Sequence, residues 1–444
     1  MRQPEWLRQF ARRLKGARVQ AGLTQQQLAQ PEFNKSFVSL LETARSYPSV
    51  ETLLALARRT RTSLASLLFD PADLRLETAL NLLHLCWVMD PARHGPEILQ
   101  FVSTAEVLVP DMPAELRVRA MLARSRAAVA AGRLDEAESL ASDAVELARR
   151  HQLEGALGRA LAIKGTVEGR RGLYPAAIAT LERALDCLHR TRSLESEDGV
   201  RALLSLAWAR WRTGQIGDAQ AAYQRALEVA TAVGLPKLRG RALVGLGIVA
   251  WRREQFDLAV EYFSQAYAVF QEIEDLAEMG RVLNNLGQVR RTQGLHDEAL
   301  AVLTTALRIR EREGDPRGRS ATLDELAQVL LALGRVDEAA QAARRAVDDA
   351  RTVGDQAREA IVQITLARIL RAQDRRPDAV ELLRGAAETL GRLGMTAEAA
   401  AAAAELGLML NEAGQREEAA DYLARALTWR TGHIPAPSPD HIDG

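Results

Sequence analysis

The stretch "TGQIGDAQAAYQRALEVA" at residues 213–230 returns in altered form along most of this chain. Clear counterparts are "AGRLDEAESLASDAVELA" at 131–148, "QGLHDEALAVLTTALRIR" at 293–310, "LGRVDEAAQAARRAVDDA" at 333–350 and "AGQREEAADYLARALTWR" at 413–430. The residue that begins the turn recurs every 40 or 42 positions, at Gly132, Gly172, Gly214, Glu254, Gly294, Gly334, Asp374 and Gly414. A fixed period of this length predicts a repeat architecture built from one small motif.

Three further positions keep one kind of residue in every copy. Alanine stands five positions after the turn residue, at Ala137, Ala177, Ala219, Ala259, Ala299, Ala339, Ala379 and Ala419. It stands again twelve positions after it, at Ala144, Ala184, Ala226, Ala266, Ala306, Ala346, Ala386 and Ala426. Seven positions before the turn every residue is small: Ser125, Gly165, Ala207, Gly247, Gly287, Ala327, Ala367 and Gly407. Small residues on one helical face let two helices approach closely, so each unit is predicted to be a helix pair joined by a glycine-led turn.

This pattern of a small residue, a turn and two alanines resembles the tetratricopeptide repeat family, in eight units over residues 117–430. The resemblance implies an all-α fold in which the pairs stack into a superhelical solenoid. The period of about 40 residues exceeds that family's common value of roughly 34, which implies longer helices, as in its kinesin-light-chain-like branch. Residues 77–116 fit a degenerate helical repeat, residues 71–76 a linker, and the proline-rich residues 431–444 a disordered tail.

Residues 1–70 differ from the repeats in charge and in pattern. They hold eleven Lys/Arg and five Asp/Glu, a net charge of +6, although the whole chain balances 58 basic against 58 acidic residues. In "LTQQQLAQPEFNKSFVSLLETARSYPSVETL" at residues 23–53, Thr24 and Gln27 have the spacing of a helix-capping box, and Pro31 interrupts the helix. The pattern predicts five short helices over residues 6–69, and the charge favours an anionic partner.

The separated anchors "LTQ", "SFVS" and "PSVETL" of that stretch resemble the phage-repressor (XRE/Cro-like) helix-turn-helix family, over about sixty residues. The resemblance implies that residues 1–70 bind double-stranded DNA. It assigns Gln25 and Arg45 to phosphates, and it places Lys35, Ser36, Phe37, Ser39 and Leu40 toward the major groove. In that groove Lys35 would read guanine, whereas Phe37 or Leu40 would meet thymine methyl groups.

Three features depart from that family's pattern. The turn "QPEF" is one residue shorter than usual, and Leu40 stands where Arg or Gln is common. Ala44 and Arg61 occupy positions where glycine usually ends a helix, which costs roughly 1 kcal/mol each if φ is positive there. Because polar base readout is sparse, the alternative is a helical domain that has lost DNA binding and only docks against the repeats.

The first helix of each unit is expected to line the concave face of the solenoid. An arginine stands at the second position of that helix in five successive units, and tryptophans and amides follow it. The candidate ligand-binding residues of this groove are Arg201, Trp208, Trp211, Arg212, Arg241, Trp251, Arg252, Arg281, Asn284, Gln288 and Arg291. Arginine clamps carboxylates, tryptophan supplies flat apolar area and amides pair with a peptide backbone, so the set favours an extended peptide or another anionic ligand. Alternatively, these arginines pair with acids such as Glu154, Glu197 or Asp198, and the tryptophans fill gaps between repeats.

No pattern in the sequence indicates catalysis. The seven histidines are scattered without a metal-ligand spacing, Cys86 and Cys187 lie about a hundred positions apart, and phosphate-binding and nucleophile-elbow motifs are absent. We therefore expect no enzymatic activity, no cofactor and no metal. The first residues have no apolar signal core and no run approaches 18 apolar residues, so we expect a cytoplasmic protein without membrane contact.

The order of a DNA-binding head and a repeat array resembles the RRNPP group of peptide-sensing regulators. The sequence thus predicts a transcriptional regulator whose repeats bind a peptide, another ligand or a protein partner. The resemblance implies that this ligand controls the geometry of a homodimer and hence its affinity for the operator. The alternative is an interaction scaffold in which the helix-turn-helix head is vestigial or only localises the protein.

Overall fold

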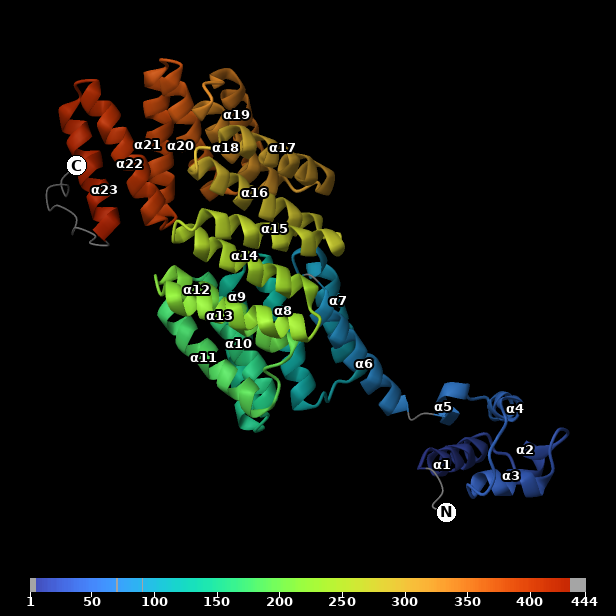
Figure 1. The fold of residues 1–444 in the computed structure, drawn as a ribbon. Coiled ribbons are helices and arrows are strands. Elements are labelled where there is room, and N and C mark those ends of the chain that lie inside the picture. Colours follow the sequence, from blue (N-terminus) through green and yellow to red (C-terminus); the bar gives the residue numbers. More distant parts are fainter. Residues whose placement is uncertain (1–4, 69–70, 90, 432–444) are drawn as a thin grey trace, which may run out of the picture. The chain divides into compact units, whose positions relative to one another are not determined.

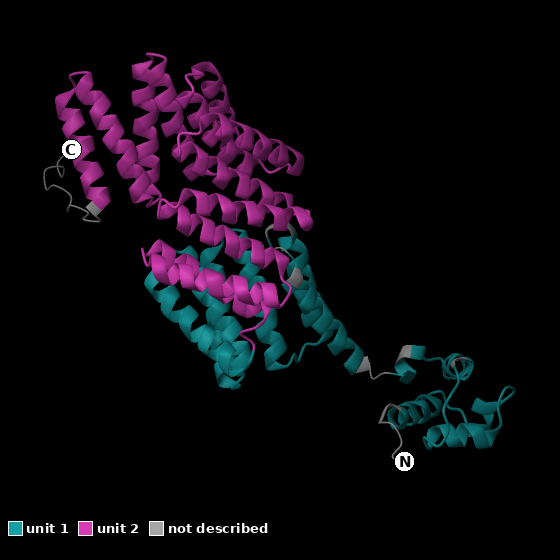
Figure 2. Cartoon of the chain, in the orientation of Figure 1, with its two compact units in different colours: residues 1–192 teal, residues 193–444 magenta. Residues whose placement is uncertain are grey.

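The computed structural model describes residues 5–68, 71–89 and 91–431, and within these ranges every regular element is a helix (Figure 1). The all-α fold expected from the sequence is therefore confirmed. The chain forms two compact units, residues 1–192 and residues 193–444 (Figure 2). None of the helices in the described ranges is long and apolar enough to cross a membrane. The expected disordered tail lies outside the described residues, except for Thr431, which ends the last helix.

Five short helices make up the N-terminal head of unit 1. They are α1 (Glu5–Gln20), α2 (Gln25–Ala29), α3 (Lys35–Glu42), α4 (Val50–Thr60) and α5 (Leu64–Leu68). The apolar face of α1 packs against the other helices, and the buried core includes Leu7, Phe10, Leu14, Leu28, Val38, Leu41, Leu56 and Leu67. The capping box at Thr24 and Gln27 is present, with both of its hydrogen bonds.

A helical pair follows the head. It consists of α6 (Pro71–Val88) and α7 (Pro91–Leu108), whose buried residues Ala79, Leu83, Ile98 and Val102 share a core with the next helix. Residues 71–76 were expected to be a linker, but they form the first turns of α6. A proline at the first helical position favours this start, because its missing N–H would have no partner there in any case.

Two repeat units complete unit 1. Their helices are α8 (Ala114–Ala130), α9 (Leu134–Arg150), α10 (Glu154–Arg170) and α11 (Tyr174–Arg190). Ala137, Ala144, Ala177 and Ala184 are fully buried between them. The small residue Ser125 donates its hydroxyl hydrogen to the carbonyl oxygen of Ala137 at 2.8 Å, so α8 and α9 meet at the two positions that the repeat pattern singled out.

Unit 2 contains six helix pairs. They are α12 (Glu197–Arg212) with α13 (Ile216–Ala232), α14 (Pro236–Arg252) with α15 (Phe256–Glu272), α16 (Leu276–Thr292) with α17 (His296–Glu313), α18 (Pro316–Ala332) with α19 (Val336–Thr352), α20 (Gln356–Ala372) with α21 (Arg376–Arg392), and α22 (Thr396–Glu412) with α23 (Arg416–Thr431). Close approach requires the small residues here too, because a methyl group at Gly247 would lie 2.6 Å from a ring carbon of Phe263. Each first helix packs on its own second helix and on the second helix of the pair before it within the unit.

Every predicted turn residue takes a left-handed backbone conformation. The φ angle is positive at all eight positions, including Glu254 (59°) and Asp374 (61°), which are not glycine. A second set of left-handed residues, which the repeat pattern did not reveal, follows the second helix of seven pairs, from α9 to α21, at Gln152, Arg192, Gly234, Glu274, Gly314, Gly354 and Gly394. The turns inside these pairs and the turns between successive pairs therefore use the same kind of backbone conformation.

Candidate nucleic-acid interface and ligand strip

The predicted recognition helix is α3, which follows α2 after the short turn at residues 30–34. Asn34 begins it, because its side-chain oxygen accepts a hydrogen bond from the backbone N–H of Phe37 at 2.7 Å. The sequence analysis did not single out this cap, although asparagine is a preferred N-cap residue. The peptide bond between Gln30 and Pro31 is cis.

Two exposed cations lie at the ends of α3. Lys35 is its first residue, and Arg45 follows it by three positions. Neither forms an ion pair or hydrogen bond through its side chain with any residue that the structure describes. Their charges are therefore available to DNA, where the resemblance to phage repressors assigns Arg45 to a phosphate and Lys35 to the major groove.

Other charges of the head are used inside it. Arg18 forms an ion pair with the buried carboxylate of Glu42 at 2.5 Å, and Gln25 donates its side-chain amide hydrogen to the same carboxylate at 2.8 Å. Arg59 pairs with Glu32 at 3.3 Å and donates to backbone oxygens of α2. Gln25 was expected to grip a phosphate, and the structure shows its amide bound to Glu42. Neither Arg18 nor Glu42 was singled out from the sequence.

The remaining candidate residues of α3 differ in exposure. Ser36 is exposed, Ser39 is half-buried, and Leu40 keeps 42% of its surface exposed. Phe37 is half-buried and packs against the head core, with its ring centre 5.7 Å from that of Phe33. Of the two apolar side chains expected to meet thymine methyl groups, Leu40 is thus the more accessible.

In unit 2, the candidate ligand residues lie on three first helices that contact one another in succession. We call them the ligand strip: Arg201, Trp208, Trp211 and Arg212 on α12, Arg241, Trp251 and Arg252 on α14, and Arg281, Asn284, Gln288 and Arg291 on α16. Contacts link members from neighbouring helices, since the guanidinium of Arg252 lies over the ring of Trp211 at 5.7 Å. On α12 itself, Arg212 lies over Trp208 at 5.6 Å.

A shared carboxylate holds two of the strip arginines. Arg241 on α14 and Arg281 on α16 both bind Glu278, at 2.8 Å and 2.5 Å. Burial would raise the pKa of the Glu278 carboxyl, but the charges and hydrogen bonds of Arg281 and Arg241 outweigh burial and leave that pKa below its usual value. Glu278 was not singled out from the sequence, although it lies one helical turn before Arg281.

Two further acidic residues, Asp324 and Glu325, lie beside the strip on α18. Glu325 accepts hydrogen bonds from Gln288 at 2.7 Å and from Arg291 at 3.3 Å. Burial raises the pKa of the Glu325 carboxyl, and the neighbouring Asp324 raises it further, against the charge of Arg291. Burial also raises the pKa of Asp324, one of whose carboxylate oxygens has no hydrogen-bond partner among the described residues.

The arginine pairing that was considered as an alternative is present. Arg201 binds Glu197 on its own helix at 2.5 Å, and Arg291 binds Glu325. Two buried polar atoms of the strip nevertheless lack a hydrogen-bond partner among the described residues, the ring nitrogen of Trp211 and the side-chain oxygen of Asn284. One is a donor and the other an acceptor, as a passing peptide group would require.

Sequence profiles of known families match both parts of the chain. A helix-turn-helix domain matches residues 9–67. Tetratricopeptide repeats match residues 118–142, 157–232, 238–312, 285–355, 360–384 and 399–441. The chain is a helix-turn-helix protein with tetratricopeptide repeats. No curated protein sequence matches it.

Solved structures resemble this helix-turn-helix repeat protein in fold. The apo quorum sensor NprR from B. thuringiensis is 14% identical, with a TM-score of 0.61, over 81% of this chain and 99% of that one. The Rap conjugation gene regulator of plasmid pLS20, in complex with the Phr* peptide, is 16% identical, with a TM-score of 0.53 over 80% and 95%. Aspartyl phosphate phosphatase F from Bacillus subtilis is 15% identical, with a TM-score of 0.55 over 81% and 94%. At these identities the likeness concerns the fold alone.

Proposed function

We propose that this protein is a cytoplasmic DNA-binding transcriptional regulator without catalytic activity. Its head would bind operator DNA, and its ligand strip would bind an extended peptide or another anionic ligand. The ligand would change the geometry of a homodimer and so its affinity for the operator. The observation that carries the DNA-binding part is the exposure of Lys35 and Arg45 near the two ends of α3, where neither has a side-chain partner among the residues that the structure describes.

The DNA-binding part is tested by fluorescence anisotropy with genomic fragments at two salt concentrations. Each cation that neutralises one phosphate contributes about one unit to the slope of log affinity against log salt. We therefore expect Lys35→Ala and Arg45→Ala each to weaken binding, and to reduce this slope by about one if they contact phosphate. Lys15→Ala removes the same charge from α1 and serves as the control. Absence of sequence preference at every salt concentration would contradict the proposal.

Three features support ligand binding at the strip. Its arginines are held in place by carboxylates but still reach solvent. The side chains of Arg241 and Arg281 stay 36% and 44% exposed, so their charged N–H groups are open to a ligand. Trp211 and Asn284 add a donor and an acceptor, which a ligand reaches only after their side chains rearrange, since both atoms are buried. Among proteins of this fold, the pLS20 regulator was solved with the Phr* peptide.

Tryptophan fluorescence tests the strip directly, because Trp208, Trp211 and Trp251 all lie on it. A panel of short peptides with free or amidated carboxyl termini provides the probes. We expect a saturable change with a free terminus, which arginine can clamp, and a weaker response after Arg201→Ala or Arg281→Ala. If Arg201→Ala and Trp251→Ala leave every response to the panel intact, the strip is not the binding site.

The homodimer part is tested by varying the distance between two DNA half-sites. Two heads on one face of the duplex need half-sites about 34 Å apart, or a multiple of that distance. Light scattering gives the mass of the protein with and without DNA, and fragments with half a helical turn inserted between half-sites should bind much more weakly. A monomer that binds every spacing equally would contradict this part.

A specific observation favours a second candidate function, a protein-interaction scaffold. Arg201, Arg241, Arg281 and Arg291 already have acidic partners, so part of the positive charge of the strip is neutralised within the protein. In the head, Gln25 is engaged by Glu42. In a scaffold the strip would bind a protein partner by shape, and the head would show no sequence preference. The anisotropy experiment separates the two candidates.

A further inference from the structure

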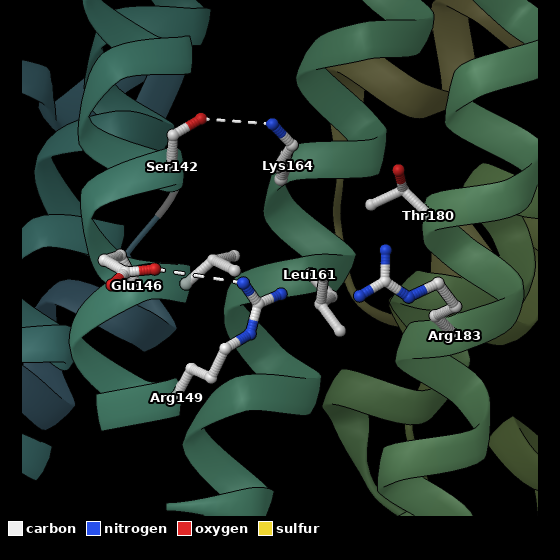
Figure 3. A pocket seen from close by; sticks show the side chains of 8 residues that line it. Ser142, Glu146, Arg149, Leu161, Lys164, Thr180 and Arg183 are labelled. Atoms are coloured by element: carbon white, nitrogen blue, oxygen red, sulfur yellow. Dashed lines mark hydrogen bonds and ion pairs between the residues drawn. The ribbon is translucent and has the colours of Figure 1, made fainter. Parts of the chain in front are cut away.

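A polar cavity of about 290 Å³ lies in unit 1, outside the head and the ligand strip. Three consecutive helices, α9, α10 and α11, supply its lining (Figure 3). Val145 and Leu161 are buried at its apolar floor, together with Thr180. In Figure 3 the guanidinium groups of Arg149 and Arg183 point toward Leu161 from opposite sides.

The lining carries an excess of positive charge. Its cations are Arg149, Lys164 and Arg183, and its one carboxylate is Glu146, which gives the lining a net charge of +2. Glu146 lies 3.8 Å from Arg149 and closer, at 2.9 Å, to Arg150 outside the cavity. This carboxylate therefore neutralises Arg149 only weakly.

Arg183 is a cation without an acidic partner. It is exposed on α11, and it forms no ion pair or hydrogen bond with any residue in the described part of the chain. Arg225 has the equivalent position in the next unit, eleven residues after the turn glycine, and it pairs with Glu228 at 3.1 Å. Arg425, at the same position of the last unit, lies over the ring of Tyr422 at 5.2 Å. Among the described residues Arg183 has neither kind of partner, and it faces the cavity.

Lys164 replaces an apolar residue of the repeat. It stands eight positions before the turn glycine, where the six later units have Leu206, Leu246, Leu286, Leu326, Leu366 and Leu406. Its ammonium group donates a hydrogen bond to the hydroxyl of Ser142 at 3.1 Å and lies 3.6 Å from Glu168. A charged group therefore occupies a position that the six later units fill with leucine, as Arg124 does in the first unit.

Thr180 is a second polar exchange at the same place. Eight positions after the turn, the other units have Leu140, Ala222, Tyr262, Val302, Ala342, Leu382 and Tyr422. Thr180 is 8% exposed, and its hydroxyl has no hydrogen-bond partner among the described residues. This hydroxyl can therefore donate a hydrogen bond to a ligand oxygen.

From this arrangement we infer that the cavity between α9, α10 and α11 binds a small molecule that carries a phosphate monoester. A phosphate monoester has a charge of about −2 near pH 7, which matches the excess charge of the lining. Two guanidinium groups bind phosphate oxygens in bidentate geometry, and Lys164, Ser142 and Thr180 supply further donors. The volume is larger than one phosphate group, so it accommodates part of the organic residue, with Leu161 beneath it.

Binding is tested on the full-length protein with glycerol phosphate as the probe, at constant ionic strength adjusted with sodium chloride. Calorimetric titration gives the affinity, and the rise of the melting temperature gives a second readout. Acetate is the comparison anion, because it carries one charge and should bind more weakly. We expect one saturable site for glycerol phosphate.

Two variants and one control locate the site. Lys164→Leu installs the residue that six other units use, and its affinity for the probe should fall at least about tenfold. Because it also removes the ion-pair partner of Glu168, its folding is checked by circular dichroism. Arg183→Gln should lower the affinity for the probe by a similar factor. Arg225→Gln removes the equivalent arginine of the next unit and should leave the affinity unchanged.

Three results of these titrations would overturn the assignment of the cavity to a phosphate monoester. The inference is overturned if glycerol phosphate shows no saturable binding, or if Lys164→Leu and Arg183→Gln bind it as tightly as the wild type. Binding of a phosphoserine peptide in the absence of glycerol phosphate binding would also overturn it, because the site would then belong to a phosphorylated partner. None of these results bears on DNA binding or on the ligand strip.

Discussion

The guanidinium Nε of Arg241 lies 2.8 Å from a carboxylate oxygen of Glu278, one helix pair further along the chain. Arg281 binds the other oxygen of the same buried carboxylate. One acid thus joins α14 to α16 and orients two arginines of the ligand strip at once.

Removal of this acid should destabilise the repeats. For Glu278→Gln we expect a loss of about 1–2 kcal/mol at neutral pH, because two half-exposed arginines lose a buried partner while solvent still screens them. The pKa of Glu278 is lowered in the folded protein, so its contribution is present above the ordinary glutamate pKa of about 4.3 and is lost as pH falls below it. Melting temperatures at pH 7 and pH 3.5 measure this difference.

The matched control is Glu272→Gln. Glu272 pairs with Arg239 at 3.5 Å, but its side chain is 69% exposed. We expect a change close to zero at both pH values. Equal losses of stability in the two variants would show that the carboxylate shared by two arginines contributes no more than an exposed ion pair.

The ionisation of Asp324 should destabilise the protein, in contrast to that of Glu278. Its pKa is raised by burial, so the folded state binds the proton more tightly and stability falls as pH rises above the ordinary aspartate pKa of about 3.9. Asp324→Asn removes this ionisation. We expect the melting temperature of the variant relative to the wild type to increase from pH 4 to pH 7; a difference that is constant with pH would contradict the buried carboxyl as its cause.

The turn at Glu254 offers a stabilising substitution. Its φ of 59° is unfavourable for a residue with a side chain, and Glu254 is exposed and makes no contact that glycine would lose inside the core. Glu254→Gly should therefore stabilise the protein by about 0.5–1 kcal/mol. Gly294→Ala, at the equivalent turn with φ of 77°, should destabilise it by a similar amount. Denaturant unfolding followed by circular dichroism measures both.

Leu40 and Lys35 should affect DNA binding in different ways. Leu40→Ala removes an apolar contact with a base and no charge, so it should relax the preference at one base pair while the salt slope stays as in the wild type. Lys35→Ala should change affinity, and the slope as well if Lys35 binds phosphate. Competition assays with single-base variants of a selected fragment distinguish the two; an unchanged preference after Leu40→Ala would exclude it from base readout.

Much of the fold follows from the sequence, because small residues leave a plain periodic signal. The eight turns, the paired alanines and the close approach at Gly247 were all predictable from the 40-residue period. The strained turn residues Ala44 and Arg61 were also anticipated, and both have positive φ, at 58° and 54°.

Other features gave no such signal. The left-handed turns at Gln152, Arg192 and Glu274 have no glycine to mark them. The partners of Arg241 and Arg291 come from a neighbouring helix, 37 and 34 positions away, so only the stacking of the pairs brings Glu278 and Glu325 to them. The roles proposed for individual residues of α3 and of the strip remain predictions that the variants above address.

The left-handed turns that join successive helix pairs have an evolutionary consequence. Because the chain passes from pair to pair through a left-handed residue at every junction from α9 to α22, a complete pair can be duplicated or deleted there without reshaping its neighbours. Array length can therefore change in single steps while the head and the remaining pairs keep their local structure. Such a chain can acquire a new binding surface, as the Lys164 and Thr180 exchanges exemplify, by altering one unit and leaving the others as they were.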